Sequence, residues 1–209
     1  RISPNGQRAA IVIEDARATM PDIWVQDLTQ KEPSPFTIDK AIDNDPVWSP
    51  DGSRIAFRST RSGRSGLYLR AVAGAGEETD LLPLDADAIF HDWSRDGRLA
   101  YSTVDSTAKT GRDVWTVPFP VDRKPAPLVA TPANEDYPRF SPSGRWVAYQ
   151  SNDGTRPEIK VTSVSGRGSF LVSADGGMQP VWGPGGRSLV YISLHNTNNA
   201  RGGHGKAGG

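Results

Sequence analysis

The sequence contains no cysteine, which excludes disulfides, thiolate metal sites and a thiol nucleophile. An excess of one charge is also absent, because 24 basic residues balance 24 acidic ones. A neutral balance gives no reason to expect nucleic acid or an anionic membrane as a partner. No apolar run is long enough to span a bilayer, and no stretch of the given residues has the pattern expected of a signal peptide. We therefore expect no nucleic-acid partner and no membrane contact from this segment.

Catalytic motifs are absent too. There is no kinase glycine-rich loop, HRD or DFG, no phosphate-binding loop ending in GK[ST], and no G-x-S-x-G nucleophile elbow. The nearest approach to the elbow, Gly63–Gly66, is one residue short. Of three histidines only His91 lies in a patterned region, and one histidine without a second ligand at a suitable spacing is a weak metal signal. We predict no catalytic residue, no metal site and no cofactor.

A short pattern recurs five times along the chain. Its clearest copy, Val47–Phe57, reads VWSPDGSRIAF. The equivalents of its serine are Ser3, Ser49, Ser94, Ser141 and Gly183, which are separated by 46, 45, 47 and 42 residues. A nearly constant period in this range, with several strand signals per period, is typical of the blades of a β-propeller.

Each copy has the composition of a tight turn between two strands. Proline pre-sets φ at the second turn position in four copies, whereas Arg95 replaces it in the third. The glycines expected at positive φ are Gly6, Gly52, Gly97, Gly144 and Gly186. An aromatic residue such as Trp48 or Trp93 precedes the turn, and we expect it to be buried between neighbouring blades.

The predicted fold class is all-β, a β-propeller of four-stranded antiparallel blades. We expect a partial propeller over residues 1–193, with blades at about 1–40, 41–84, 85–131, 132–174 and 175–193, the last a half blade. Four and a half blades, out of a ring of about six, form an open arc with exposed blade faces at both ends. Residues 194–209 are rich in Gly and Asn, and we expect a disordered tail there. Because the chain opens at the end of a first strand, we also expect it to be an excerpt of a longer polypeptide.

The turn SPDG-x-R-IAF and the following strand DIWV resemble the WD-like repeats of TolB-type propellers. The segments DRKP (Asp122–Pro125) and GRWVAYQS (Gly144–Ser151) resemble, more specifically, the C-terminal propeller of bacterial membrane-bound serine/threonine protein kinases. In that family a kinase domain and a membrane helix precede a propeller that faces outward. The resemblance implies a sensing or interaction module in a periplasmic or otherwise extracytoplasmic location.

Polar residues gather just before each expected inner strand, in loops that would surround one mouth of a propeller channel. The candidate binding residues are Asp43, Asp45, His91, Asp92, Glu135, Asp136 and Gln179. Like charges brought together would raise one another's pKa and favour a cation or a basic partner group. The alternative is that these are solvated turn residues, because Asp and Asn suit turn geometry. The acids that open the third strands, Asp22, Asp113 and Glu158, are expected to be structural.

The predicted function is a non-catalytic module that binds a protein or small-molecule ligand, in the extracytoplasmic C-terminal part of a serine/threonine kinase. Two alternatives remain open: the gating propeller of a prolyl-oligopeptidase-type peptidase, and a soluble periplasmic TolB-like partner protein. A hydrolase domain beyond Ser193 would favour the peptidase. Kinase motifs upstream of Arg1 would favour the kinase, and a signal peptide upstream would favour the TolB-like partner protein. The identity of the ligand or partner is not predicted by these residues.

Overall fold

The computed structural model describes residues 1–14, 20–74, 79–84, 87–104, 110–119 and 123–194. Within these ranges the chain forms antiparallel strands, a single 3-10 turn (η1, Pro184–Gly186) and no α-helix. The strands make five consecutive sheets, and in each sheet they follow one another in chain order. The expected tail, 194–209, lies outside the described residues except for Leu194.

Each sheet is one blade. The first blade contains β1 (Arg8–Ile13), β2 (Asp22–Asp27) and β3 (Ser34–Pro35), and the second contains β4 (Asp43–Trp48), β5 (Arg54–Ser59), β6 (Gly66–Ala71) and β7 (Thr79–Pro83). The third contains β8 (Ile89–Trp93), β9 (Arg98–Val104), β10 (Arg112–Pro118) and β11 (Ala126–Val129). The fourth contains β12 (Asn134–Phe140), β13 (Trp146–Asn152), β14 (Pro157–Ser163) and β15 (Ser169–Leu171), and the fifth has β16 (Gly177–Trp182) and β17 (Leu189–Ser193).

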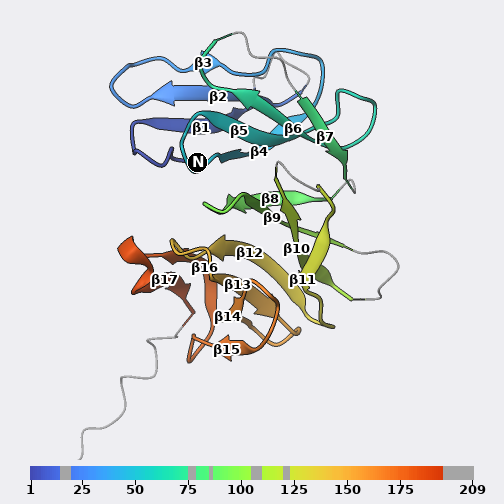
Figure 1. The fold of residues 1–209 in the computed structure, drawn as a ribbon, viewed down its shortest axis with the longest axis vertical. Coiled ribbons are helices and arrows are strands. Elements are labelled where there is room, and N and C mark those ends of the chain that lie inside the picture. The colour runs from blue at the N-terminus through green and yellow to red at the C-terminus, as the bar shows by residue number, and fades with distance from the viewer. Residues whose placement is uncertain (15–19, 75–78, 85–86, 105–109, 120–122, 195–209) are drawn as a thin grey trace, which may run out of the picture.

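The blades follow one another around an arc (Figure 1). The first blade lies at the top of the view and the fourth at the bottom, and β16 and β17 turn back toward the N-terminal side. The first blade has an inner stub, since Ile2 forms an isolated bridge with Ala9. The prediction of an incomplete all-β propeller built from four-stranded blades is confirmed, whereas a complete ring of six stays a prediction.

The repeated turns have the conformation that the sequence predicts. The five turn glycines have φ between 69° and 86°. In the second blade, Ser49 Oγ donates to the Asp51 carboxylate at 2.5 Å and accepts the backbone N–H of Arg54 at 2.9 Å. The hydrogen bonds from Ser49 and then from Ser53 lower the pKa of Asp51 to about 2. The serine and the aspartate therefore stabilise the turn as a pair.

Replacing Ser49 by alanine is expected to raise the pKa of Asp51 toward its ordinary value. Because the folded-state pKa of Asp51 lies below the unfolded one, its contribution to stability is full above about pH 4 and is lost as the pH falls toward 2. The variant should therefore lose less stability than the wild type across that window. Carboxyl NMR titration and acid unfolding measure both effects, and an unchanged Asp51 pKa in the variant would contradict this account.

Apolar faces between blades form the core. Val47 and Ala56 are paired across β4 and β5, and they face Phe90, Trp93 and Tyr101 of the third blade in one buried cluster. The equivalent small residues Ala10 and Ala100 likewise cluster with aromatic residues of the following blade, Trp48 and Phe140. Trp93 is 7% exposed, and its predicted burial, like that of Trp48, is confirmed.

In the fifth blade, the face equivalent to that of Val47 and Ala56 has no following blade to pack against in the described structure. Val181 and Val190 are paired as Val47 and Ala56 are, yet they are 55% and 63% exposed. Ile192, two residues further along β17, is 53% exposed. These residues form the interblade face of a blade that has no following neighbour in the described structure, as the open arc predicts.

Candidate functional site

The four inner strands each contain a bulge shortly before their closing aromatic residue. In β4, for example, two residues lie between the pairs Asn44–Arg58 and Val47–Ala56, opposite a single residue of β5. In three of these strands the bulge is an X-Pro pair whose first residue has positive φ: Asp45, Tyr137 and Gln179, at 52° to 53°. Such a φ is uncommon for residues other than glycine, and bulges re-aim the side chains beside them.

The bulges correct the expected positions of the candidate residues. The sequence predicts that the polar residues lie in loops before the inner strands. The structure places Asp45, Asp136 and Gln179 inside β4, β12 and β16. The physical reason is that proline, which lacks an N–H donor, is tolerated at a bulge and therefore does not mark the start of the strand.

Two of the candidate carboxylates do not reach the surface. Asp43 is 0% exposed and accepts a hydrogen bond from Arg61 Nη2 at 2.8 Å. Glu135 is 1% exposed and accepts the Thr131 hydroxyl at 2.5 Å, and burial raises the pKa of Glu135. Both side chains connect segments within their own blade.

His91, Ser102 and Asp136 form a buried polar cluster between the third and fourth blades. His91 Nε2 lies 2.9 Å from both Ser102 Oγ and Asp136 Oδ1, and Ser102 donates to Asp136 at 2.7 Å. Burial lowers the pKa of His91 more than Asp136 raises it, which favours neutral imidazole. Burial opposes ionisation of Asp136 as well, but the hydrogen bonds from His91 and Ser102 hold its pKa below the usual value.

This cluster does not have the geometry of a catalytic triad. In a triad one ring nitrogen of the histidine faces the serine and the other faces the carboxylate. Here Nε2 faces both groups, while Nδ1 is buried without a hydrogen-bond partner among the described residues. Ser102 is 0% exposed, so a substrate cannot reach its hydroxyl. The cluster therefore connects blades and does not supply a nucleophile.

Asp45 and Asp92 are both partnered in the channel. Asp45 accepts a hydrogen bond from Arg58 Nε at 3.2 Å, although burial raises the pKa of Asp45. The Asp92 carboxylate accepts the backbone N–H groups of Trp93 and Phe140, at 2.9 and 2.7 Å. The second of these bonds crosses from the third blade to the fourth.

Arg139 is the opposite charge beside Asp92. It occupies, on β12, the position that Asp92 has on β8, directly before the closing aromatic residue, and it donates to the backbone oxygen of His91. Burial, followed by the charge of Arg1, lowers the pKa of Arg139 to about 10. Burial also raises the pKa of Asp92, and Arg139 opposes that rise.

The structure thus brings together Asp45, His91, Asp92 and Asp136, but it does not make an acidic mouth. Arg1 lines a cavity with Asp92 and also interacts electrostatically with Asp45, so both aspartates lie near one guanidinium group. They converge among arginines, however, so the expectation that they raise one another's pKa is wrong. Gln179 is exposed at the equivalent bulge of β16. A binding role for the predicted residues stays a prediction.

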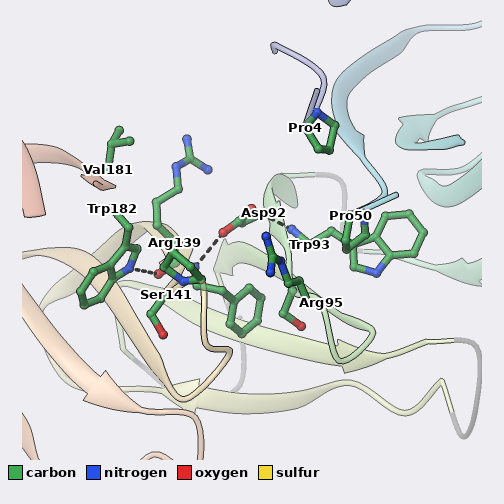
Figure 2. A pocket seen from close by; sticks show the side chains of 12 residues that line it. Pro4, Pro50, Asp92, Trp93, Arg95, Arg139, Ser141, Val181 and Trp182 are labelled. Carbon is green, nitrogen blue, oxygen red and sulfur yellow. Dashed lines mark hydrogen bonds between the residues drawn. The ribbon is translucent and has the colours of Figure 1, made fainter. Parts of the chain in front are cut away.

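The channel side of the arc is hollow. A cavity of about 480 Å³ is lined by Arg1, Asp92, Arg139 and apolar residues that include Val47 and Val181. Figure 2 shows the adjoining pocket of about 330 Å³, where Asp92 lies between Arg139 on one side and Arg95 and Trp93 on the other. Side chains from all five blades line the two cavities together.

Sequence reasoning missed the arginines of the site: Arg1, Arg58 and Arg139. The available signal was the alignment of the repeats, because the residue before the closing aromatic is Val47, Asp92, Arg139 and Val181 in successive blades. Side chains alternate along a strand, so this position faces away from the buried aromatic. Comparing the repeats at that position would have shown Asp92 and Arg139 at equivalent places in neighbouring blades.

Two of the acids that open the third strands, Asp22 and Glu158, make structural contacts, as predicted. Asp22 accepts the Thr37 hydroxyl at 3.0 Å, and that hydroxyl accepts the backbone N–H of Ile23 at 2.9 Å. Glu158 and Ser173 repeat this arrangement in the fourth blade. The arrangement ties the third strand to the end of the outer strand.

Two kinds of feature are absent from the described residues. These residues contain no group of three or more His, Cys, Asp or Glu side chains arranged to hold a metal ion. They also contain no helix that is long and apolar enough to cross a membrane.

Comparison with known proteins gives a family match over most of the chain. The family described as "TolB beta propeller domain" matches residues 1–185. The chain is 27% identical over 188 residues to the uncharacterized peptidase YuxL of Bacillus subtilis, covering 72% of this chain and 28% of that protein. It is 26% identical over 170 residues to the uncharacterized protein Atu1656 of Agrobacterium fabrum, covering 78% of this chain and 56% of that protein. The chain thus spans between about a quarter and just over half of these relatives.

Among solved structures, TolB from Acinetobacter baumannii has a TM-score of 0.76 at 14% identity. The match covers 93% of this chain and 48% of that one. At this level of identity the likeness concerns the fold alone.

Proposed function

Because the chain belongs to the TolB β-propeller domain family, we propose that it is a non-catalytic recognition module that binds a protein or small-molecule ligand at the end of its channel. We call the end of the channel at which β4, β12 and β16 begin the bulge-side mouth. Asp45, Tyr137 and Gln179 are its characteristic residues, since each is the positive-φ residue of a bulge.

The observation that carries this proposal is the threefold recurrence of a strained bulge at the channel. A left-handed conformation in a residue other than glycine costs about 1–3 kcal/mol and persists where the surrounding structure enforces it. Three such residues, an acid, a phenol and an amide, occupy equivalent positions on the inner strands of three blades. This arrangement supports recognition of a partner with mixed polar and charged groups, and it does not support binding of a bare cation.

The proposal can be tested without knowing the natural partner. Random peptides would be selected on the immobilised chain, and the bound peptides would then be measured against the variant D45N/Y137A/Q179A. The expected result is that most selected peptides lose affinity about ten-fold or more, as for the loss of central contacts in an interface. A triple variant of exposed residues in the β2–β3 and β14–β15 loops, K31A/S165A/R167A, is the matched control, because these loops lie at the other end of the strands. The proposal would be contradicted by peptides that bind the control variant more weakly than the wild type but bind the bulge-side variant as tightly as the wild type.

We further propose that the parent protein is a membrane-bound serine/threonine kinase with an extracytoplasmic propeller. This part of the proposal rests on the DRKP and GRWVAYQS segments alone. The relative that is named a peptidase favours a second candidate, in which the propeller gates a hydrolase domain. Sequence on either side of residues 1–209 in the gene decides between them. Kinase motifs upstream support the first, and a nucleophile elbow downstream supports the second.

The purified 209-residue chain is expected to show no phosphate transfer from ATP and no hydrolysis of peptides or esters. The reason is the absence of the corresponding motifs, together with the burial of Ser102 beside His91. A panel of chromogenic esters and peptides, and radiolabelled ATP, measures this. Turnover that is lost in both S102A and H91Q, and kept in S65A, would show that the cluster is catalytic after all.

A further inference from the structure

The two ends of the channel differ in charge. Near the bulge-side mouth, Asp45 is bonded to Arg58, and Asp136 is bonded to His91 and Ser102. On the opposite side, where the repeated turns lie, Arg1, Arg139 and Asp92 line one cavity, and Arg95, Arg139 and Asp92 line the adjoining pocket. We call this the turn-side cavity. The acidic mouth that the sequence predicts is the one at which the inner strands begin, so it concerns the other end of the channel.

We propose that the turn-side cavity binds the carboxylate group of a small ligand, with Arg139 and Arg1 as inner contacts and Arg95 at the rim. The inference goes beyond the proposed function, since it concerns the other side of the channel and different residues. It can hold or fail independently of recognition at the bulge-side mouth.

Arg139 and Arg1 are two like charges that line the same partly desolvated cavity. Burial lowers the pKa of each, and the charge of Arg1 is the next contribution to the lowered pKa of Arg139. Arg139 has one donor committed to the backbone oxygen of His91, and its planar group carries further N–H donors. A carboxylate that enters the cavity would relieve the repulsion and accept paired hydrogen bonds, the arrangement that guanidinium groups favour.

Asp92 does not fill this role, although it lies nearby. Its two oxygens accept the backbone N–H groups of Trp93 and Phe140, which fixes the carboxylate against the wall between the third and fourth blades. Among the residues that line the cavity and its adjoining pocket, Asp92 is the one carboxylate beside three guanidinium groups. Asp45 and Asp136 also act on Arg1 and Arg139, but they lie outside this lining and are bonded to Arg58 and to Ser102. The cavity therefore keeps a net positive charge with Asp92 ionised.

Arg95 is the one departure from the turn proline among the five repeats, and it lies at the rim of this cavity. The equivalent residues Pro4, Pro50 and Pro142 line the same pocket. Arg95 is exposed, and among the described residues it makes no hydrogen bond or ion pair. It also lines a neighbouring groove of about 370 Å³ between the second and third blades. Figure 2 shows Arg95 and Arg139 on either side of Asp92.

The remaining walls indicate what the carboxylate is attached to. Ile2, Val47, Trp48, Trp93 and Val181 line the cavity of about 480 Å³, a size that suits a small molecule or the last residues of a peptide. A peptide C-terminus combines a carboxylate with an apolar side chain, so it fits these walls best. A sugar acid presents the same carboxylate on a polar body, and the experiment distinguishes the two sources.

The test is a titration of the 209-residue chain with acetyl-Ala-Ala-Leu as the free acid, the same peptide as the C-terminal amide, and a galacturonic acid disaccharide. Fluorescence of Trp48 and Trp93, which line the cavity, provides the readout together with calorimetry. We expect saturable binding of the free acid and binding of the amide that is about ten-fold weaker or less, because a charge-assisted pair is lost. Binding of the disaccharide alone would uphold the carboxylate site and assign it to sugar acids.

Variants distinguish binding in the cavity from a general attraction between the ligand's carboxylate and positive charge on the protein. R139M is expected to weaken binding of the acid about ten-fold or more. R95P should weaken it about three-fold, since a rim charge contributes less, and should fold, because four of the five repeats carry proline there. R64A removes the same charge from a distant exposed loop and should change nothing. Equal affinity for acid and amide, equal effects of R95P and R64A, or no saturable binding of either acid up to about 10 mM would overturn the proposal.

Discussion

Replacing Trp93 by alanine is expected to lower the free energy of unfolding by about 3–5 kcal/mol, as truncation of a large buried aromatic does. Trp93 is 7% exposed and packs edge-on against Phe119, with ring centroids 5.4 Å apart. The guanidinium of Arg54 lies 5.9 Å from its ring centroid. The indole therefore joins the second blade to the third, and the cavity left by its removal would lie between them.

Trp146 is the control for this prediction. It belongs to the same repeat architecture but is 37% exposed, and its ring contacts only the exposed Phe170 in the aromatic pairs of the described structure. Trp146→Ala is expected to cost within about 1 kcal/mol, the range of surface substitutions. Urea unfolding followed by circular dichroism measures both variants. Equal losses would mean that Trp93 does not lie between blades.

Replacing Gly97 by alanine is expected to cost about 2–5 kcal/mol. Gly97 has φ of 86°, and a Cβ built there would lie 2.3 Å from the backbone oxygen of Phe119. An L-residue in the left-handed region costs about 1–2 kcal/mol. Displacing the backbone of Phe119 adds about 1–3 kcal/mol, as overpacking does elsewhere.

Gly6 is the matched control, because it occupies the same turn position in the first blade. Its φ is 71°, and a Cβ built there meets no atom within 4 Å. Gly6→Ala should therefore show only the backbone cost of about 1–2 kcal/mol. If the two substitutions destabilise the protein equally in thermal or urea unfolding, the close approach between Gly97 and Phe119 is absent.

The fold could be predicted from the sequence because its repeats encode local chemistry and packing at once. The turn needs a residue at positive φ, and glycine stands at that position in every copy. The alternation of Ala56 with Phe57 likewise predicts a small face and a large face on each blade, and Ala56 and Phe57 lie in two different buried clusters. Features that recur five times can be recognised without knowing any long-range contact.

The candidate site was only partly predictable, because its chemistry comes from positions at which the repeats differ. Asp92 and Arg139 are at equivalent places in neighbouring blades, so their opposition emerges only once the blades are arranged side by side. Asp43 accepts a hydrogen bond from Arg61, 18 residues further along the chain, and the sequence alone does not show this contact. Local sequence placed acids near the channel, but only the arrangement of the blades shows which side chains neutralise them.

Photo-crosslinking from the bulge-side mouth tests the central claim most directly. Benzoylphenylalanine would be placed at Gln179, exposed on the bulge of β16, or at Leu171, which is 63% exposed on the outer strand of the fourth blade. In the native host, a recognition module that uses its channel should give a discrete adduct from position 179 and none from position 171. An adduct from position 171 alone would place recognition on the outer edge and contradict the account.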